Sequence, residues 1–168
     1  MNSHNAGRKY LVTGASGYVG GRLVRALIDE KEDVRILVRD KHKIMGQPWA
    51  TQVDICEGTA EKFGDLERAL EGIHTAFYLL HSINLGPNFD EIEKEMARNF
   101  AKAAEQAGVS QIIYLGGIAN DVNISKHLAS RAMTGSSLAT TSVAVLELRA
   151  GIIIGSGSAS FEMLRHLT

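Results

Sequence analysis

The most constraining feature of this sequence is a run of glycines between an apolar segment and a helical one. Residues 14–20 read GASGYVG and directly follow the apolar segment YLVT at residues 10–13. From residue 18 to about residue 30, apolar side chains recur at helical spacing. A strand, a glycine turn and a helix in this order predict the first βα unit of a parallel sheet.

The same alternation of short apolar runs and helical segments continues along the chain. Further strands are predicted at residues 34–38, 52–57, 75–80, 111–115 and 143–149. Helices are predicted around residues 66–70, at 89–107 and, rich in Ser and Thr, at 125–139. Residues 1–168 contain no linker or low-complexity segment. We therefore expect a single α/β domain, a doubly wound parallel sheet between helical layers (three-layer α/β/α), with no separate lobe for a substrate.

The glycine turn is typical of a site for the pyrophosphate of a dinucleotide. Side chains at Gly14 and Gly17 would keep a phosphate away from the backbone, and Gly20 allows the helix to pack closely. The helix N-terminus then offers unpaired N–H groups to the anion. Ser16 can cap this helix or donate to a phosphate, and the two roles are compatible. The alternative is a tight turn that holds no ligand.

The end of the second predicted strand distinguishes two cofactors. NAD sites place an acidic residue there for the adenosine ribose, whereas NADP sites need positive charge for the 2′-phosphate. This chain has Arg39, followed by Asp40, Lys41 and Lys43. Because the guanidinium group fits a phosphate dianion, the sequence favours NADP. In the alternative, Arg39 is only a solvated strand end, and Asp40 binds the ribose of NAD.

Composition excludes several other classes of function. The net charge is −1 without a large basic patch, so nucleic-acid binding has little support. Cys56 is the only cysteine, which excludes an internal disulfide, and we interpret it as a small buried residue of a strand. The six histidines are scattered, so no metal site is expected. The polar N-terminus has no signal peptide, and no apolar run reaches the roughly 20 residues of a membrane helix, so we expect a cytoplasmic protein.

Several segments together resemble one family. They read VTGASGYVGG from residue 12, LVRD from residue 37, FYLLHS from residue 77, NFAKAA from residue 99 and LRAGIIIG from residue 148. In these segments the chain resembles the NmrA-like, atypical extended branch of the short-chain dehydrogenase/reductase superfamily. The resemblance implies a Rossmann fold with strand order 3-2-1-4-5-6 that binds NAD(P). Many members also continue into a C-terminal region, which we expect this chain to lack.

The resemblance also implies a set of cofactor-binding residues. Arg39 would take the adenosine side, and Gly116 and Gly117 would lie beside the nicotinamide. His81 could transfer a proton, although a loop histidine is more often structural. The residues implied at the pyrophosphate and at the central ribose are Gly14, Ser16, Gly17, Tyr18, Val19 and Gly20, followed by Leu80, His81 and Ser82.

Two features depart from the family pattern. The acid that commonly binds adenine after the third strand is replaced by Thr59, a weaker hydroxyl. Active members also use a Ser or Thr after the fifth strand and a Tyr-x-x-x-Lys pair, but none of the four tyrosines here has a lysine four residues later. Gly116 and Gly117 stand where the hydroxyl residue is expected.

Three functions therefore stay open. The chain is an NADP-dependent oxidoreductase domain, a non-catalytic NAD(P)H sensor or scaffold, or an inactive fragment of a longer reductase. The amphipathic residues 161–168 favour the fragment, and an apolar edge there would favour a homo-oligomer or a partner chain. Two local interpretations complete the analysis. Trp49 packs over the sheet rather than over adenine, and the acidic residues Asp90, Glu91, Glu93 and Glu95 form a solvated helix face.

Overall fold

The computed structural model describes residues 7–80, 89–118, 126–158, 161–162 and 165–166. Its six strands form one parallel sheet in the order β3-β2-β1-β4-β5-β6, which confirms the predicted fold and strand order. The strands are β1 (Lys9–Thr13), β2 (Asp33–Val38), β3 (Asp54–Glu57), β4 (Thr75–Tyr78), β5 (Gln111–Gly117) and β6 (Ala144–Ala150).

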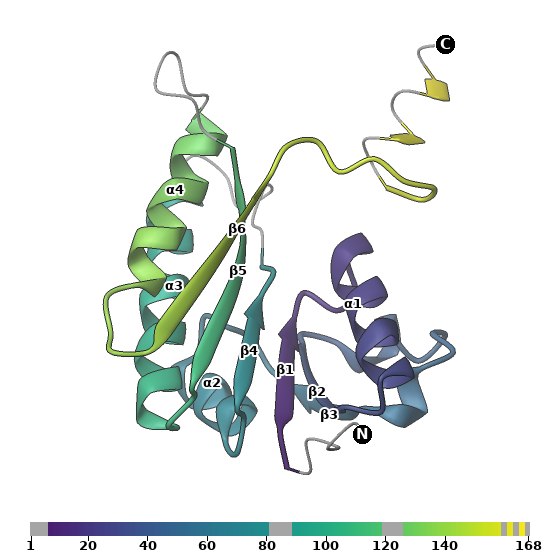
Figure 1. Cartoon of the computed structure of the whole chain (residues 1–168), viewed down its shortest axis with the longest axis horizontal. Coiled ribbons are helices and arrows are strands. Elements are labelled where there is room, and N and C mark those ends of the chain that lie inside the picture. Colours follow the sequence, from purple (N-terminus) through teal and green to yellow (C-terminus); the bar gives the residue numbers. More distant parts are fainter. Residues whose placement is uncertain (1–6, 81–88, 119–125, 159–160, 163–164, 167–168) are drawn as a thin grey trace, which may run out of the picture.

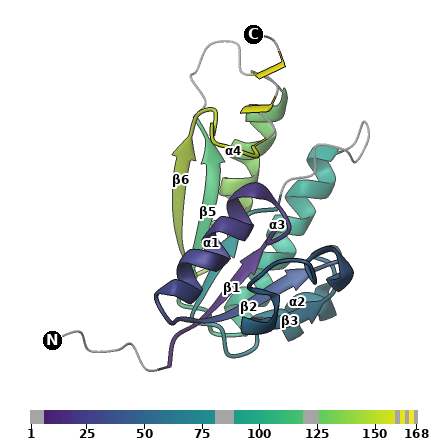
Figure 2. The same cartoon turned by 90° about the vertical axis from the view of Figure 1, so that its right-hand side faces the viewer.

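Helices cover the two faces of this sheet unequally (Figures 1 and 2). One face carries α2 (Phe63–Leu70), α3 (Phe89–Gln106) and α4 (Lys126–Leu138), and the other carries α1 (Tyr18–Asp29). The connection between β2 and β3 contains only two short 3₁₀ helices, η1 (Lys41–Lys43) and η2 (Ala50–Gln52). Each predicted strand and helix is present, although β4 ends two residues before its predicted end, at Tyr78.

Two apolar clusters, one on each face, hold the layers together. The larger one joins α2, α3 and α4 to the sheet around the fully buried Leu11, Phe100 and Ile112. The smaller one packs α1 onto β1 and β2 and includes Trp49, whose exposed fraction is only 3%. Trp49 therefore packs over the sheet, as the sequence predicted.

The prediction of a fully solvated acidic face on α3 is wrong for Glu93. Its side chain is buried with 6% exposed, and one carboxylate oxygen accepts a hydrogen bond of 2.6 Å from the Ser130 hydroxyl of α4. Glu93 therefore lies in the α3–α4 interface, where α4 provides a polar partner that helical periodicity cannot reveal.

Cys56 is half-buried on β3 rather than fully buried. Burial raises the pKa of its thiol, which keeps it protonated near neutral pH and fits the interpretation as a packing residue. Among the described residues, no helix is both long and apolar enough to span a membrane.

Candidate functional site

Thr13, the last residue of β1, fixes the carboxyl edges of two neighbouring strands. Its buried hydroxyl donates to the carbonyl of Phe77 at 2.9 Å and accepts from the N–H of Leu79 at 3.0 Å. Phe77 lies in β4, and Leu79 directly follows its last residue. Since ligands of parallel α/β folds bind outside the carboxyl ends of the strands, this pair of bonds shapes the floor of the candidate site. Sequence reasoning treated Thr13 only as part of a motif.

Gly14 begins the turn in a conformation that a side chain would not tolerate. Its φ is +70°, and a Cβ there would lie 2.7 Å from the carbonyl oxygen of Leu79. The N–H of Gly17 closes the turn on the carbonyl of Gly14 at 3.0 Å. A Cβ on Gly20 would collide with the same carbonyl, so the first turn of α1 packs directly on Gly14. Gly14 and Gly20 thus allow close packing within the turn, while Ser16 and Gly17 between them are exposed, as an approaching phosphate requires.

The N-terminus of α1 has no side-chain cap among the described residues. The N-cap is Gly17, and the exposed Ser16 makes no capping hydrogen bond, so the capping interpretation of Ser16 is wrong. The reason is positional, because Ser16 lies one residue before the cap, in the turn. The first N–H groups of α1 are thus left for an anion, and the Ser16 hydroxyl stays available beside them. Tyr18 and Val19 are the first two helical residues and are half-buried.

Arg39 follows β2 at the same edge and is exposed. No hydrogen bond or ion pair engages its guanidinium within the described part of the chain. Asp40, in contrast, uses Oδ1 to accept from the N–H of His42 at 2.9 Å and so caps η1. Lys41 lies 3.8 Å from Glu57 on β3. One oxygen of the Asp40 carboxylate is thus engaged locally, while no partner from the described residues engages Arg39.

Thr59 lies next to Arg39 in the fold because the N–H of Gly58 donates to the carbonyl of Val38 at 2.9 Å. The Thr59 hydroxyl accepts from the N–H of Glu61 at 3.3 Å and is half-buried. Asp65 on α2 accepts from the N–H of Thr59 at 2.9 Å and from Arg68 at 2.7 Å. The pKa of Asp65 is held below its usual value mainly by the backbone N–H of Thr59 and, to a smaller extent, by Arg68. Sequence reasoning missed Asp65, which lies six residues beyond the expected position.

The remaining predicted residues divide between described and undescribed segments. Leu80 is half-buried and packs against the larger apolar cluster. His81 and Ser82 lie outside the described residues. A groove of about 540 Å³ adjoins the glycine turn, and its lining includes Ser16, Gly17, Tyr18, Arg25 and Trp49.

At the end of β5, where a catalytic hydroxyl would be expected, Gly116 lies against the side chain of Glu147. A Cβ on Gly116 would collide with the Glu147 carboxylate of β6, which is paired with Arg149 at 3.1 Å. Tyr78 on β4 and Tyr114 on β5 are also poor proton donors. Burial raises the pKa of both Tyr78 and Tyr114, and the Tyr114 hydroxyl already donates to the carbonyl of Arg131 at 2.9 Å.

Comparisons with known proteins agree with this geometry. A family of domains described as NAD(P)H-binding matches residues 14–150. A 3-beta-hydroxysteroid dehydrogenase of Mycolicibacterium neoaurum is 32% identical over 118 residues, which cover 63% of this chain and 31% of that protein.

Two solved structures share the fold. The triphenylmethane reductase of Citrobacter sp., complexed with NADP(H), has a TM-score of 0.71 at 22% identity, over 86% of this chain and 50% of that one. A short-chain dehydrogenase/reductase superfamily protein from Agrobacterium tumefaciens with bound NAD has a TM-score of 0.69 at 19% identity, over 84% and 48%. This chain thus spans about half the length of those proteins.

Proposed function

Because the chain belongs to the NAD(P)H-binding family of the atypical, extended short-chain dehydrogenase/reductase type, we propose that it binds NADP(H) at the carboxyl edge of β1 and β2. The observation that carries this proposal is the accessible glycine turn at the uncapped N-terminus of α1. The N–H groups there receive the pyrophosphate, together with the Ser16 hydroxyl. Tyr18, Val19 and Gly20 line it through their backbone, and Leu80, His81 and Ser82 flank the central ribose.

The preference for NADP over NAD rests on the contrast between Arg39 and Asp40. Arg39 is exposed and unpaired among the described residues, whereas Asp40 is already bound to the N–H of His42. A guanidinium group pairs with a phosphate dianion through charge-assisted hydrogen bonds, each worth roughly 1.5–3 kcal/mol. Thr59 completes the adenosine side with a hydroxyl group.

Calorimetric titration with NADPH and NADH tests this proposal. We expect tighter binding of NADPH, and we expect Arg39→Ala to weaken NADPH by about 10- to 100-fold while leaving NADH nearly unchanged. Arg98→Ala is the matched control, since it removes an exposed arginine from α3, on the other face of the sheet and outside the groove. Folded protein that binds neither dinucleotide contradicts the proposal. Equal affinity for NADPH and NADH rejects the assignment of Arg39 to the 2′-phosphate but leaves the proposal of dinucleotide binding intact.

As to chemistry, we propose by analogy with the relatives that the domain serves an NADP-dependent oxidoreductase. The chain itself supplies cofactor binding and orientation. A non-catalytic NADP(H) sensor or scaffold is the second candidate, favoured by the absence of a Tyr-x-x-x-Lys pair and by Gly116 packed against Glu147. NADPH oxidation in the presence of carbonyl and quinone substrates separates the two, because a sensor binds the cofactor without turnover.

The apolar edge at β6 supports self-association or binding of a partner chain as part of the same proposal. Leu146 and Leu148 of β6 are 45% and 50% exposed, and Ile152 and Ile154 beyond it are 77% and 59% exposed. Sedimentation over a range of protein concentrations tests this, with a dimer expected at high concentration and a monomer throughout as the contrary result.

A further inference from the structure

The segment after β6 crosses the carboxyl edge of the sheet to reach α1. β6 is the edge strand, so a connection from its end at Ala150 to α1 must pass the ends of β5 and β4. Figure 1 shows this path, running from the tip of β6 across the top of the sheet to a position above α1. We call residues 151–158 the strap.

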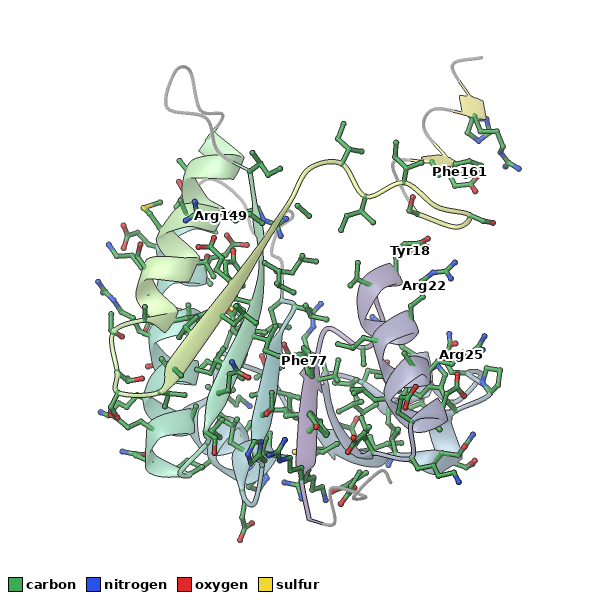
Figure 3. All side chains as sticks on the ribbon, in the orientation of Figure 1. Tyr18, Arg22, Arg25, Phe77, Arg149 and Phe161 are labelled. Carbon is green, nitrogen blue, oxygen red and sulfur yellow. The ribbon has the colours of Figure 1, made fainter. Side chains whose placement is uncertain are left out.

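Arg22 and Tyr18 hold the far end of the strap against the first turn of α1 (Figure 3). The Arg22 guanidinium donates to the carbonyl of Ser156 at 3.0 Å and lies 4.5 Å above the centre of the Tyr18 ring. The Tyr18 hydroxyl lies against the Cα of Gly155, so a Cβ at that position would collide with it. One stacked pair of side chains thus contacts two successive residues of the strap.

The strap end is itself ordered around Ser158, which is buried with 4% exposed. The Ser158 hydroxyl accepts from the N–H of Gly155 at 3.2 Å and from that of Phe161 at 3.1 Å. The N–H of Ser158 donates to the carbonyl of Gly155 at 2.8 Å. Arg22 and Tyr18 therefore contact a hydrogen-bonded turn and not an extended chain.

The strap and the glycine turn border the same groove. Its lining includes Gly157 of the strap as well as Ser16, Gly17, Tyr18 and Arg22. The contacts to the strap use the side chains of Tyr18 and Arg22, whereas the pyrophosphate would use backbone N–H groups at the start of α1. The strap and the cofactor would thus bind to different chemical groups at the start of α1 and would not compete for the same ones.

From this geometry we propose that the Tyr18–Arg22 clasp makes the strap a lid over the dinucleotide, so that cofactor binding and strap closure stabilise each other. The proposal rests on the proposed function, since it needs a dinucleotide on the glycine turn. Whichever strap position binds the cofactor more tightly becomes more populated when the cofactor binds, and the coupling is reciprocal. Tyr18 and Arg22 are therefore positioning residues for the strap.

Hydrogen exchange of residues 152–158, combined with NADPH affinity and dissociation rate, tests this coupling. In the unaltered protein, NADPH is expected to slow exchange of the strap amides. Arg22→Ala and Gly155→Ala are expected to abolish that protection, to weaken NADPH at least about fivefold and to speed its dissociation. Gly155→Ala changes no charge, so its effect separates strap closure from attraction of Arg22 for a phosphate. Arg98→Ala, which removes an exposed arginine from α3 outside the groove, is expected to bind and exchange as the unaltered protein does.

A double substitution links the effect to the contact itself. Tyr18→Phe removes the hydroxyl with which a Cβ at residue 155 collides, so Tyr18→Phe/Gly155→Ala is expected to recover part of the affinity lost in Gly155→Ala.

Four outcomes overturn the coupling. If NADPH binds but leaves strap exchange unchanged, and both strap variants bind normally, the strap is not a lid. Tighter binding by the variants, or faster strap exchange on binding, means that strap and cofactor compete. Absence of the recovery in the double variant rejects the clasp as the origin. If the unaltered protein binds no NADPH, the proposed function fails first and the coupling fails with it.

Discussion

The two halves of the sheet differ on the face that carries α1. One row of paired residues crosses this face from Ile36 and Val12 to Phe77, Ile113 and Leu146. Ile36 and Val12 are fully buried under α1, Phe77 and Ile113 are half-buried, and Leu146 is 45% exposed. All five residues are apolar, so the change along the row arises from the covering layer and not from composition. Parallel strands usually carry helices on both faces. Among the described residues, this condition is met around β1 and β2, which we call the covered half, and not towards β6.

The candidate site follows the same division. The covered half provides the glycine turn, the uncapped helix N-terminus and Arg39, which has no partner in the described part of the chain. In the other half, Gly116 packs against Glu147, and the sheet tyrosines have raised pKa values. The groups suited to hold a dinucleotide therefore lie in the covered half of the sheet, and the other half does not add an accessible proton donor from Tyr78 or Tyr114. In this fold, a half that can bind a cofactor does not require a half that can reduce a substrate.

The largest effect is expected at the glycine turn. Gly14→Ala combines a positive φ with a collision against the Leu79 carbonyl, so we expect it to lower the free energy of unfolding by about 2–5 kcal/mol and to abolish dinucleotide binding. Gly72→Ala is a matched control, because Gly72 has the same φ of +70° but no atom within 4 Å of an added Cβ. That change is expected to cost about 1–2 kcal/mol in urea denaturation. Equal losses for the two variants would contradict the role of the collision.

The next effect compares a leucine in the core with one on the open face. Leu11 is fully buried, and Leu11→Ala is expected to cost about 2–5 kcal/mol. Leu148 is 50% exposed, and Leu148→Ala is expected to cost less than about 1 kcal/mol. A loss at Leu148 equal to that at Leu11 would mean that this face is covered in solution. Repeating the denaturation at several protein concentrations then identifies another copy of the chain as the cover.

These comparisons also mark what the sequence could predict. The glycine turn and the end of β2 were predictable because spacing along the chain determines a turn and a strand end, whereas the strand order followed from the resemblance to the family. Glu93 and Asp65 were not, since their roles depend on Ser130 and Thr59, which the fold brings to them from other elements. The position of Ser16 relative to the cap was missed because a helix boundary can shift by one residue without changing the periodic pattern.

A smaller effect distinguishes Ser16 from a capping serine. Because Ser16 makes no capping bond, Ser16→Ala is expected to change the free energy of unfolding by less than about 0.5 kcal/mol. Ser158→Ala, in contrast, removes a hydroxyl that accepts two N–H groups and is expected to cost about 1 kcal/mol. Thermal denaturation measures both. NADPH titration of Ser16→Ala should still show weaker binding, and unchanged affinity would remove Ser16 from the proposed phosphate site.

The smallest effect concerns pH and the two carboxylates near β3. The pKa of Asp65 is lowered mainly by the backbone N–H of Thr59 and then by Arg68, and that of Asp54 is lowered by hydrogen bonds from Lys9 and Arg35, against opposing desolvation. A lowered pKa in the folded protein stabilises it above the unfolded pKa of about 4, and this stabilisation is lost as pH falls through the folded pKa. Stability is therefore expected to be flat from about pH 7 to pH 5 and to fall below about pH 4. Asp65→Asn and Asp54→Asn should each reduce this fall, as denaturation at a series of pH values would measure.

The same two variants are expected to differ in their affinity for NADPH. Only Asp65→Asn is expected to weaken NADPH binding, because it loosens the Thr59 turn at the end of β3, whereas Asp54 lies at the opposite end of that strand. Equal NADPH affinity in the two variants would place Thr59 outside the adenosine half of the site.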